Sequence, residues 1–178
     1  SVTESSVVSP ASSRAALTEL SWFVGDWLDE SEDARVISSV NWSENESFLV
    51  RSIVAQNADE SVAKVGTQVV GWDPRMQQIR SWTFNADGSF GDGLWSKSGD
   101  DWLVKSSQTL ANGEAASGTY VITPVDENTL TMQLIGHEIE GQPVPASDSV
   151  TIVRVPQPEE QPGSEVSPSK PATQPTAN

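Results

Sequence analysis

Turn-forming residues punctuate the sequence at regular intervals from Trp27 to Val155, and this spacing constrains the fold more than any other feature. The turn clusters recur about every 12 to 15 residues, and the segments between them are rich in Val, Ile, Thr and Trp, as hairpin-connected strands are. No helical stretch lies between them to carry a parallel crossover, so we expect the strands to pair antiparallel. The turn clusters are Ser43 to Glu46, Asn57 to Ser61, Asp73 to Met76, Ala86 to Gly88, Ser98 to Asp100, Asn112 to Glu114, Asp126 to Asn128 and Glu140 to Pro143.

The pattern amounts to roughly ten strands in a meander. An open sheet of that width would expose two edges and curl under its own twist, so closure is expected. We therefore predict an all-β fold, an antiparallel up-and-down β-barrel. A ring of about ten strands is too wide to be filled easily, and the chain has seven Trp but only four Phe and two Met for the purpose. The sequence thus predicts an interior cavity of roughly a few hundred Å³.

Both ends of the chain differ from this strand pattern. Apolar residues of the run 11–23 recur near the helical period of about 3.6 residues, which predicts a short N-terminal helix. Residues 157–178 are rich in Pro, Ser, Thr and Gln and too poor in apolar side chains to offset the entropy of ordering, so we expect a disordered tail. The predicted organisation is a flexible lead over 1–13, one barrel domain over 14–156 and the tail.

Composition excludes several function classes. The formal charge of −15 repels nucleic-acid phosphates and anionic lipid headgroups, and no apolar stretch approaches the roughly 20 residues of a membrane-spanning helix. The chain has no cysteine and His137 as its only histidine, which removes multi-histidine and thiolate metal sites. We therefore expect no nucleic-acid partner, no membrane insertion, no metal and no cofactor. The polar run from Ser1 to Ser13 begins without Met, as in a trimmed product, which favours an exported protein, periplasmic or extracellular.

The segment Gly25-Asp26-Trp27 follows the predicted helix and opens the first strand. It resembles the Gly-x-Trp signature of the calycin superfamily, the lipocalins and fatty-acid-binding proteins. The resemblance implies that Trp27 closes one end of the barrel and that Arg154, near the end of the last predicted strand, packs across its indole ring. Gly25, Trp27 and Arg154 are accordingly predicted to form a structural clasp.

Three further motifs are Trp72-Asp73-Pro74, the strand Ile79 to Phe84, and the glycine-rich segment Asp87 to Trp95. They are similar to a domain of exported bacterial proteins, particularly from planctomycetes, that usually follows a SnoaL-like (ketosteroid-isomerase-like) domain. The resemblance spans Leu20 to Pro156 and implies a calycin-type barrel whose biochemical role is unassigned. Ten-stranded haem-binding barrels, the nitrobindins, use one axial histidine, so haem ligation by His137 is a less favoured alternative to a rim position.

Two polar motifs are interpreted structurally. Gly91-Asp92-Gly93 lacks the following helix that a phosphate-binding loop requires, so we expect a bend or bulge of the barrel wall there. The acidic run Asp29 to Asp33 lacks the spacing of a calcium loop and is typical of a solvated turn.

The candidate ligand-binding residues are Arg51, Arg80, Trp82 and Trp95. Strand alternation places Arg80 on the same face as Trp82 and Phe84. If that face points inward, Arg51 and Arg80 would orient an anionic group, as interior arginines do in fatty-acid-binding barrels, and Trp82 and Trp95 would form the wall. If it points outward, Arg80 would pair with nearby carboxylates and the two tryptophans would form a surface patch that needs a partner.

The leading hypothesis is therefore non-catalytic binding of a small, largely apolar or amphipathic molecule inside the barrel. The alternative is an interaction module, or a homodimer, that uses an outer aromatic face. An isomerase or cyclase on the same barrel is a remote third reading, because no activated nucleophile or acid–base pair can be assembled from the sequence.

Overall fold

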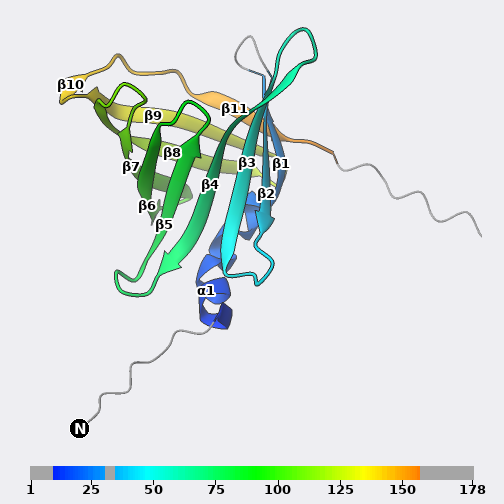
Figure 1. Ribbon diagram of the computed structural model, residues 1–178. Coiled ribbons are helices and arrows are strands. Elements are labelled where there is room, and N and C mark those ends of the chain that lie inside the picture. Colours follow the sequence, from blue (N-terminus) through cyan, green and yellow to red (C-terminus); the bar gives the residue numbers. More distant parts are fainter. Residues whose placement is uncertain (1–9, 31–34, 157–178) are drawn as a thin grey trace, which may run out of the picture.

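A computed structural model describes residues 10–30 and 35–156 (Figure 1). The predicted C-terminal tail lies outside the described residues, as does most of the predicted N-terminal lead. The end of that lead is helical, because the first helix begins at Pro10. The elements are α1 (Pro10–Leu17), a 3-10 helix η1 (Thr18–Phe23), β1 (Gly25–Asp29), β2 (Arg35–Trp42), β3 (Phe48–Gln56), β4 (Val62–Asp73), β5 (Gln78–Asn85), β6 (Phe90–Ser98), β7 (Asp101–Thr109), β8 (Ala115–Asp126), β9 (Thr129–Ile139), β10 (Gln142–Pro143) and β11 (Val150–Arg154).

The strands form one closed antiparallel barrel. Each strand from β1 to β9 pairs with the next, and β11 closes the ring because it pairs with both β9 and β1. This gives the ten strands expected from the turn spacing, with the short β10 added beside the end of β9. The all-β fold with a short N-terminal helix, predicted from the sequence, is confirmed.

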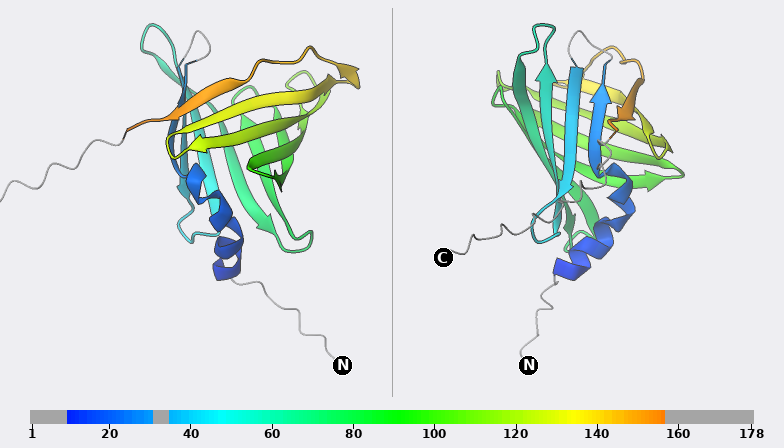
Figure 2. Two further views of the ribbon diagram at one scale, coloured as in Figure 1. Left: turned by 180° about the vertical axis from the view of Figure 1, so that it is seen from behind. Right: turned by 90° about the vertical axis from the view of Figure 1, so that its right-hand side faces the viewer.

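The N-terminal helical segment covers one end of the barrel, as Figures 1 and 2 show. Phe23 of η1 packs 6.2 Å from Trp95 between ring centroids, and Trp95 packs edge-on against Trp102 at 6.3 Å. Leu17 and Leu20 are fully buried in the same core. The hydrophobic core therefore lies at this closed end, where the helices and strands meet. No helix among the described residues is long and apolar enough to cross a bilayer.

Gly25, Trp27 and Arg154 lie together where the helical segment enters β1. The Arg154 guanidinium carbon lies 4.2 Å from the Trp27 ring centroid, and its Nη1 and Nη2 donate to the Val24 and Trp22 carbonyls at 2.6 and 2.9 Å. Gly25 has φ +126°, and a Cβ there would lie 2.4 Å from Arg154 Nη1. Glycine is needed at this position for its backbone conformation and because the arginine approaches so closely.

Gly91 and Gly93 do not mark a bulge. Strand β6 pairs with β5 and β7 without a register shift at either glycine. A Cβ on Gly91 would lie 2.4 Å from the Ser107 carbonyl oxygen, and one on Gly93 would lie 2.8 Å from Ser81 Oγ. The expectation of a bulge is corrected: close packing against neighbouring strands, inside a regular ladder, accounts for these glycines.

Candidate functional site

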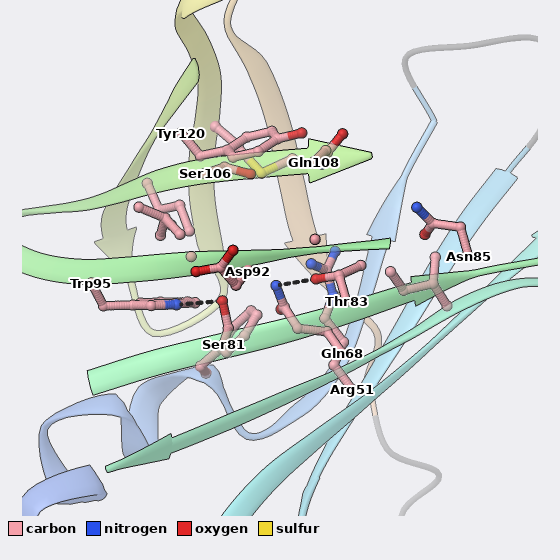
Figure 3. Close-up of a pocket in the computed structure, with 17 residues that line it drawn as sticks. Arg51, Gln68, Ser81, Thr83, Asn85, Asp92, Trp95, Ser106, Gln108 and Tyr120 are labelled. Atoms are coloured by element: carbon pink, nitrogen blue, oxygen red, sulfur yellow. Dashed lines mark hydrogen bonds between the residues drawn. The ribbon is translucent and has the colours of Figure 1, made fainter. Parts of the chain in front are cut away.

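A cavity of about 360 Å³ lies inside the barrel above the closed end (Figure 3). Its volume agrees with the few hundred Å³ expected from strand number and core composition. It falls at the small end of the usual range of ligand pockets, roughly 300–1,000 Å³. The cavity is lined by the inward faces of β3 to β9 and by Phe23 of η1; its polar lining residues are Arg51, Gln68, Ser81, Thr83, Asn85, Asp92, Ser106, Gln108 and Tyr120.

Arg51 is the most unusual side chain of the cavity. Its Nη2 donates to Ser38 Oγ at 2.9 Å, and its guanidinium carbon lies 5.7 Å from the Phe23 ring centroid. Its Nε is buried and has no hydrogen-bond partner. Burial lowers the pKa of Arg51 to about 10, although the electrostatic interaction with Tyr120 acts in the opposite direction. The guanidinium therefore remains a cation at neutral pH.

The other barrel arginines are better compensated. Arg80 forms ion pairs with Asp73 at 3.3 Å and with Asp92 at 3.4 Å. Arg154 donates to three backbone carbonyls. Arg51, by contrast, forms no ion pair with any residue that the structure describes. Even a partly buried cation without a counterion is unfavourable, so the cavity favours an anion beside Arg51.

Polar side chains continue from Arg51 across three neighbouring strands. Arg51 is the direct cross-strand partner of Gln68, and Gln68 is the partner of Thr83. The same row passes through Gly91 to Gln108. Gln68 Nε2 donates to Thr83 Oγ1 at 3.2 Å, whereas Gln68 Oε1 is buried and accepts no hydrogen bond. The row thus leaves one donor, Arg51 Nε, and one acceptor unpaired on adjacent residues.

Apolar side chains line the rest of the wall toward the closed end. Trp95 is 3% exposed, and its Nε1 donates to Ser81 Oγ at 2.9 Å (Figure 3). Because its polar atom is already paired, Trp95 offers only its ring to the cavity. The remaining apolar lining comes from Phe23, Ile53, Val104, Ile122 and Met132. The cavity is therefore amphipathic, with an apolar base and polar walls.

Of the four predicted ligand-binding residues, two line the cavity and two lie on the outer face of the barrel. Arg51 and Trp95 line the cavity. Arg80 and Trp82 lie on the outer face of β5, where the Arg80 guanidinium carbon is 5.5 Å from the Trp82 ring centroid. The prediction that these two residues line the interior is wrong, because Ser81 and Thr83 occupy the inward positions of the strand. Arg80 instead has the outward, carboxylate-paired role that was the alternative.

Sequence reasoning missed Gln68, Thr83, Gln108 and Tyr120. Alternation on β5 does place Ser81 and Thr83 together, but polar side chains at alternate positions ordinarily indicate a solvent-facing side. Proximity in sequence gives no signal either, because the acidic residue nearest Arg51 is Glu46, five positions away, and those nearest Arg80 are Asp73 and Asp87, seven positions away.

His137 lies on β9 and lines a separate small space beside Ser106, Gln108 and Tyr120, outside the main cavity. Within residues 10–30 and 35–156, no group of three or more His, Cys, Asp or Glu side chains could hold a metal ion.

Comparisons with known proteins support the fold alone. No family model matches the sequence, and no curated protein matches it. Among solved structures, the chain is similar to Rv2717c from M. tuberculosis, a crystal structure with 13% sequence identity and a TM-score of 0.52. The similarity covers 79% of this chain and 98% of that one. At this level of identity the likeness is one of barrel architecture.

Proposed function

We propose that this protein is a small-molecule binding protein whose barrel holds a compact amphipathic ligand with an anionic group. The ligand's apolar part lies against Trp95 and Phe23 at the closed end, and its anionic group lies beside Arg51. Arg51 carries the proposal, because it is a partly buried cation that lines the cavity, has a buried Nε without a hydrogen-bond partner and lacks a carboxylate partner among the described residues.

The net negative charge of the protein means that an anion would need a local cation such as Arg51 to bind. With a formal charge of −15, the protein repels anions at long range, so a bound anion must be held by short-range contacts. Hydrogen bonds to a charged group contribute about 1.5–3 kcal/mol each, more than neutral ones. A guanidinium set over an aromatic ring in a semi-enclosed cavity supplies such contacts.

The test is a fluorescence titration with 1-anilinonaphthalene-8-sulfonate, an anionic aromatic probe of suitable size. Arg51→Met should weaken binding about tenfold or more, as loss of a charge-assisted hydrogen bond predicts. Arg80→Met removes the same charge from the outer face and is the matched control, expected to change the dissociation constant less than about twofold. Absence of binding to the parent protein, or equal losses in the two variants, would refute the proposal.

We also infer that the barrel belongs to the calycin superfamily, and that it is related to the domain that accompanies SnoaL-like domains in exported bacterial proteins. The contact of Arg154 with Trp27 beside Gly25 supports the first inference. The motifs around Trp72, Trp82 and Trp95 support the second. Identification of a SnoaL-like domain encoded directly upstream would test the second inference, and a different neighbouring domain would count against it.

A second candidate function is an interaction surface on the outer face of β3 to β6. Phe48, Phe84 and Phe90 are 39%, 57% and 50% exposed there, and the Phe48 ring lies against Gly71. Exposed apolar patches of this kind often mark contacts with other proteins. Sedimentation of the protein across a concentration series would reveal a dimer, and Phe84→Ser with Phe90→Ser should then shift it to monomer.

A further inference from the structure

The unpaired polar atoms of the cavity also indicate which chemical group the ligand carries next to its anionic group. Arg51 presents unpaired donor capacity, and Gln68 Oε1 is a buried acceptor that receives no hydrogen bond. Buried polar atoms of native proteins are nearly always hydrogen-bonded, so each of these atoms calls for a partner. An anion alone satisfies Arg51 and leaves Gln68 Oε1 unpaired.

The two residues are direct cross-strand partners on β3 and β4. Side chains in that relation have Cβ atoms roughly 4.5–5.5 Å apart, so one small molecule can reach both with neighbouring groups. Figure 3 shows Arg51 and Gln68 side by side on one wall of the cavity. Gln68 is held in place by its hydrogen bond to Thr83 Oγ1, which leaves its oxygen as the free end of the amide.

We propose that the ligand is a compact acid with a hydroxyl or N–H group on the atom next to its carboxylate, as in a 2-hydroxy acid with an apolar ring. The carboxylate accepts from Arg51, and the adjacent hydroxyl or N–H donates to Gln68 Oε1. The ring lies toward Trp95 and Phe23, within a cavity of about 360 Å³. This inference rests on the proposed anion-binding function and defines its ligand class.

A matched pair of probes, 3-phenyllactate and 3-phenylpropionate, isolates the single hydroxyl group. Isothermal titration calorimetry should show that phenyllactate binds the parent protein about threefold to tenfold more tightly, which is the usual contribution of one neutral hydrogen bond. In Gln68→Leu this preference should disappear, whereas Arg51→Met should weaken both acids. Gln142→Leu is the matched control, because Gln142 is exposed on β10 and does not line the cavity.

The ratio of the two affinities is insensitive to a general loss of stability, because both acids meet the same folded protein. Equal affinities in the parent, or a preference that survives Gln68→Leu, would overturn the ligand class while leaving anion binding intact. Tighter binding of phenylpropionate would also overturn it, since the cavity would then offer no hydrogen-bond partner to the hydroxyl. If neither acid binds the parent and the sulfonate probe also fails, the proposed function itself falls.

Discussion

Arg51, Arg80 and Arg154 all lie on strands of the barrel, but they differ in their hydrogen-bond and ion-pair partners. Arg154 is fixed by three carbonyls and an indole ring, and Arg80 by two carboxylates. Arg51 has one hydroxyl partner and a phenyl ring. Arg80 Nε, like Arg51 Nε, has no hydrogen-bond partner, but the charge of Arg80 is paired with carboxylates, whereas the charge of Arg51 is not paired with any described residue. Local compensation of charge therefore separates structural arginines from the candidate binding residue.

Arg154→Ala should lower the free energy of unfolding by about 1–3 kcal/mol, because it removes the cation–π contact, packing and hydrogen bonds that close the barrel end. Urea denaturation followed by tryptophan fluorescence measures the loss. Arg35→Ala, in an exposed ion pair with Glu30, is the control and should cost less than about 1 kcal/mol. A variant as stable as the parent would show that the clasp does not hold the end closed.

Arg51→Met should leave the ligand-free protein as stable as the parent or stabilise it by about 1 kcal/mol, because an uncompensated, partly buried charge is replaced by an apolar chain. The same variant should lose anion binding. Urea denaturation without ligand provides the measurement. A loss of more than about 2 kcal/mol would assign Arg51 to the structural framework.

At the scale of elements, β5 shows why the interior was harder to predict than the fold. Alternation correctly grouped Arg80 with Trp82 and Phe84, and Ser81 with Thr83, but it carries no information on which group faces inward. Burial of aromatic residues is the usual guide to the inward face. Here it fails because the cavity wall is polar and because the outer Trp82 is covered by Arg80.

The turn between β4 and β5 depends on the ionised form of Asp73. The Met76 backbone N–H holds the pKa of Asp73 below its ordinary value, and Arg80 and the Arg75 N–H add to the effect. A carboxylate with a lowered pKa stabilises the fold above its unfolded pKa of about 3.9, and that stabilisation is lost as the pH falls through the folded value.

Asp73→Asn should therefore lower the Tm by a few degrees at pH 7, and the gap from the parent should close as the pH falls below about 4. Differential scanning calorimetry over a pH series measures the gap. Asp148→Asn, which removes the same charge at an exposed position before β11, is the control. A gap that persists at low pH would attribute the effect to lost packing.

At the scale of the whole molecule, the fold was predictable because turn spacing and the absence of crossover helices leave few alternatives to a closed antiparallel barrel. The lining of the cavity was not, because it depends on strand phase and on contacts between residues distant in sequence, such as Arg51 with Phe23 and Gln68 with Thr83. The close packing of Gly91 against the Ser107 carbonyl could not be predicted either, because glycines in a regular strand and glycines at a bulge give the same local sequence pattern.

Removal of residues 157–178 should change the Tm by less than about 1 °C. The composition of that segment lacks the apolar surface needed to stabilise a contact with the barrel. Thermal unfolding followed by circular dichroism compares the two chains. A drop of several degrees would mean that the segment contributes to the folded domain.

The most direct test of anion binding at Arg51 is native mass spectrometry of the parent protein and Arg51→Met as isolated, followed by denaturing extraction. We predict an added mass on the parent, released on denaturation as a small acidic molecule and absent from Arg51→Met. A parent protein that carries no added mass, or an adduct that both proteins retain equally, would contradict a barrel interior built to hold an anion at Arg51.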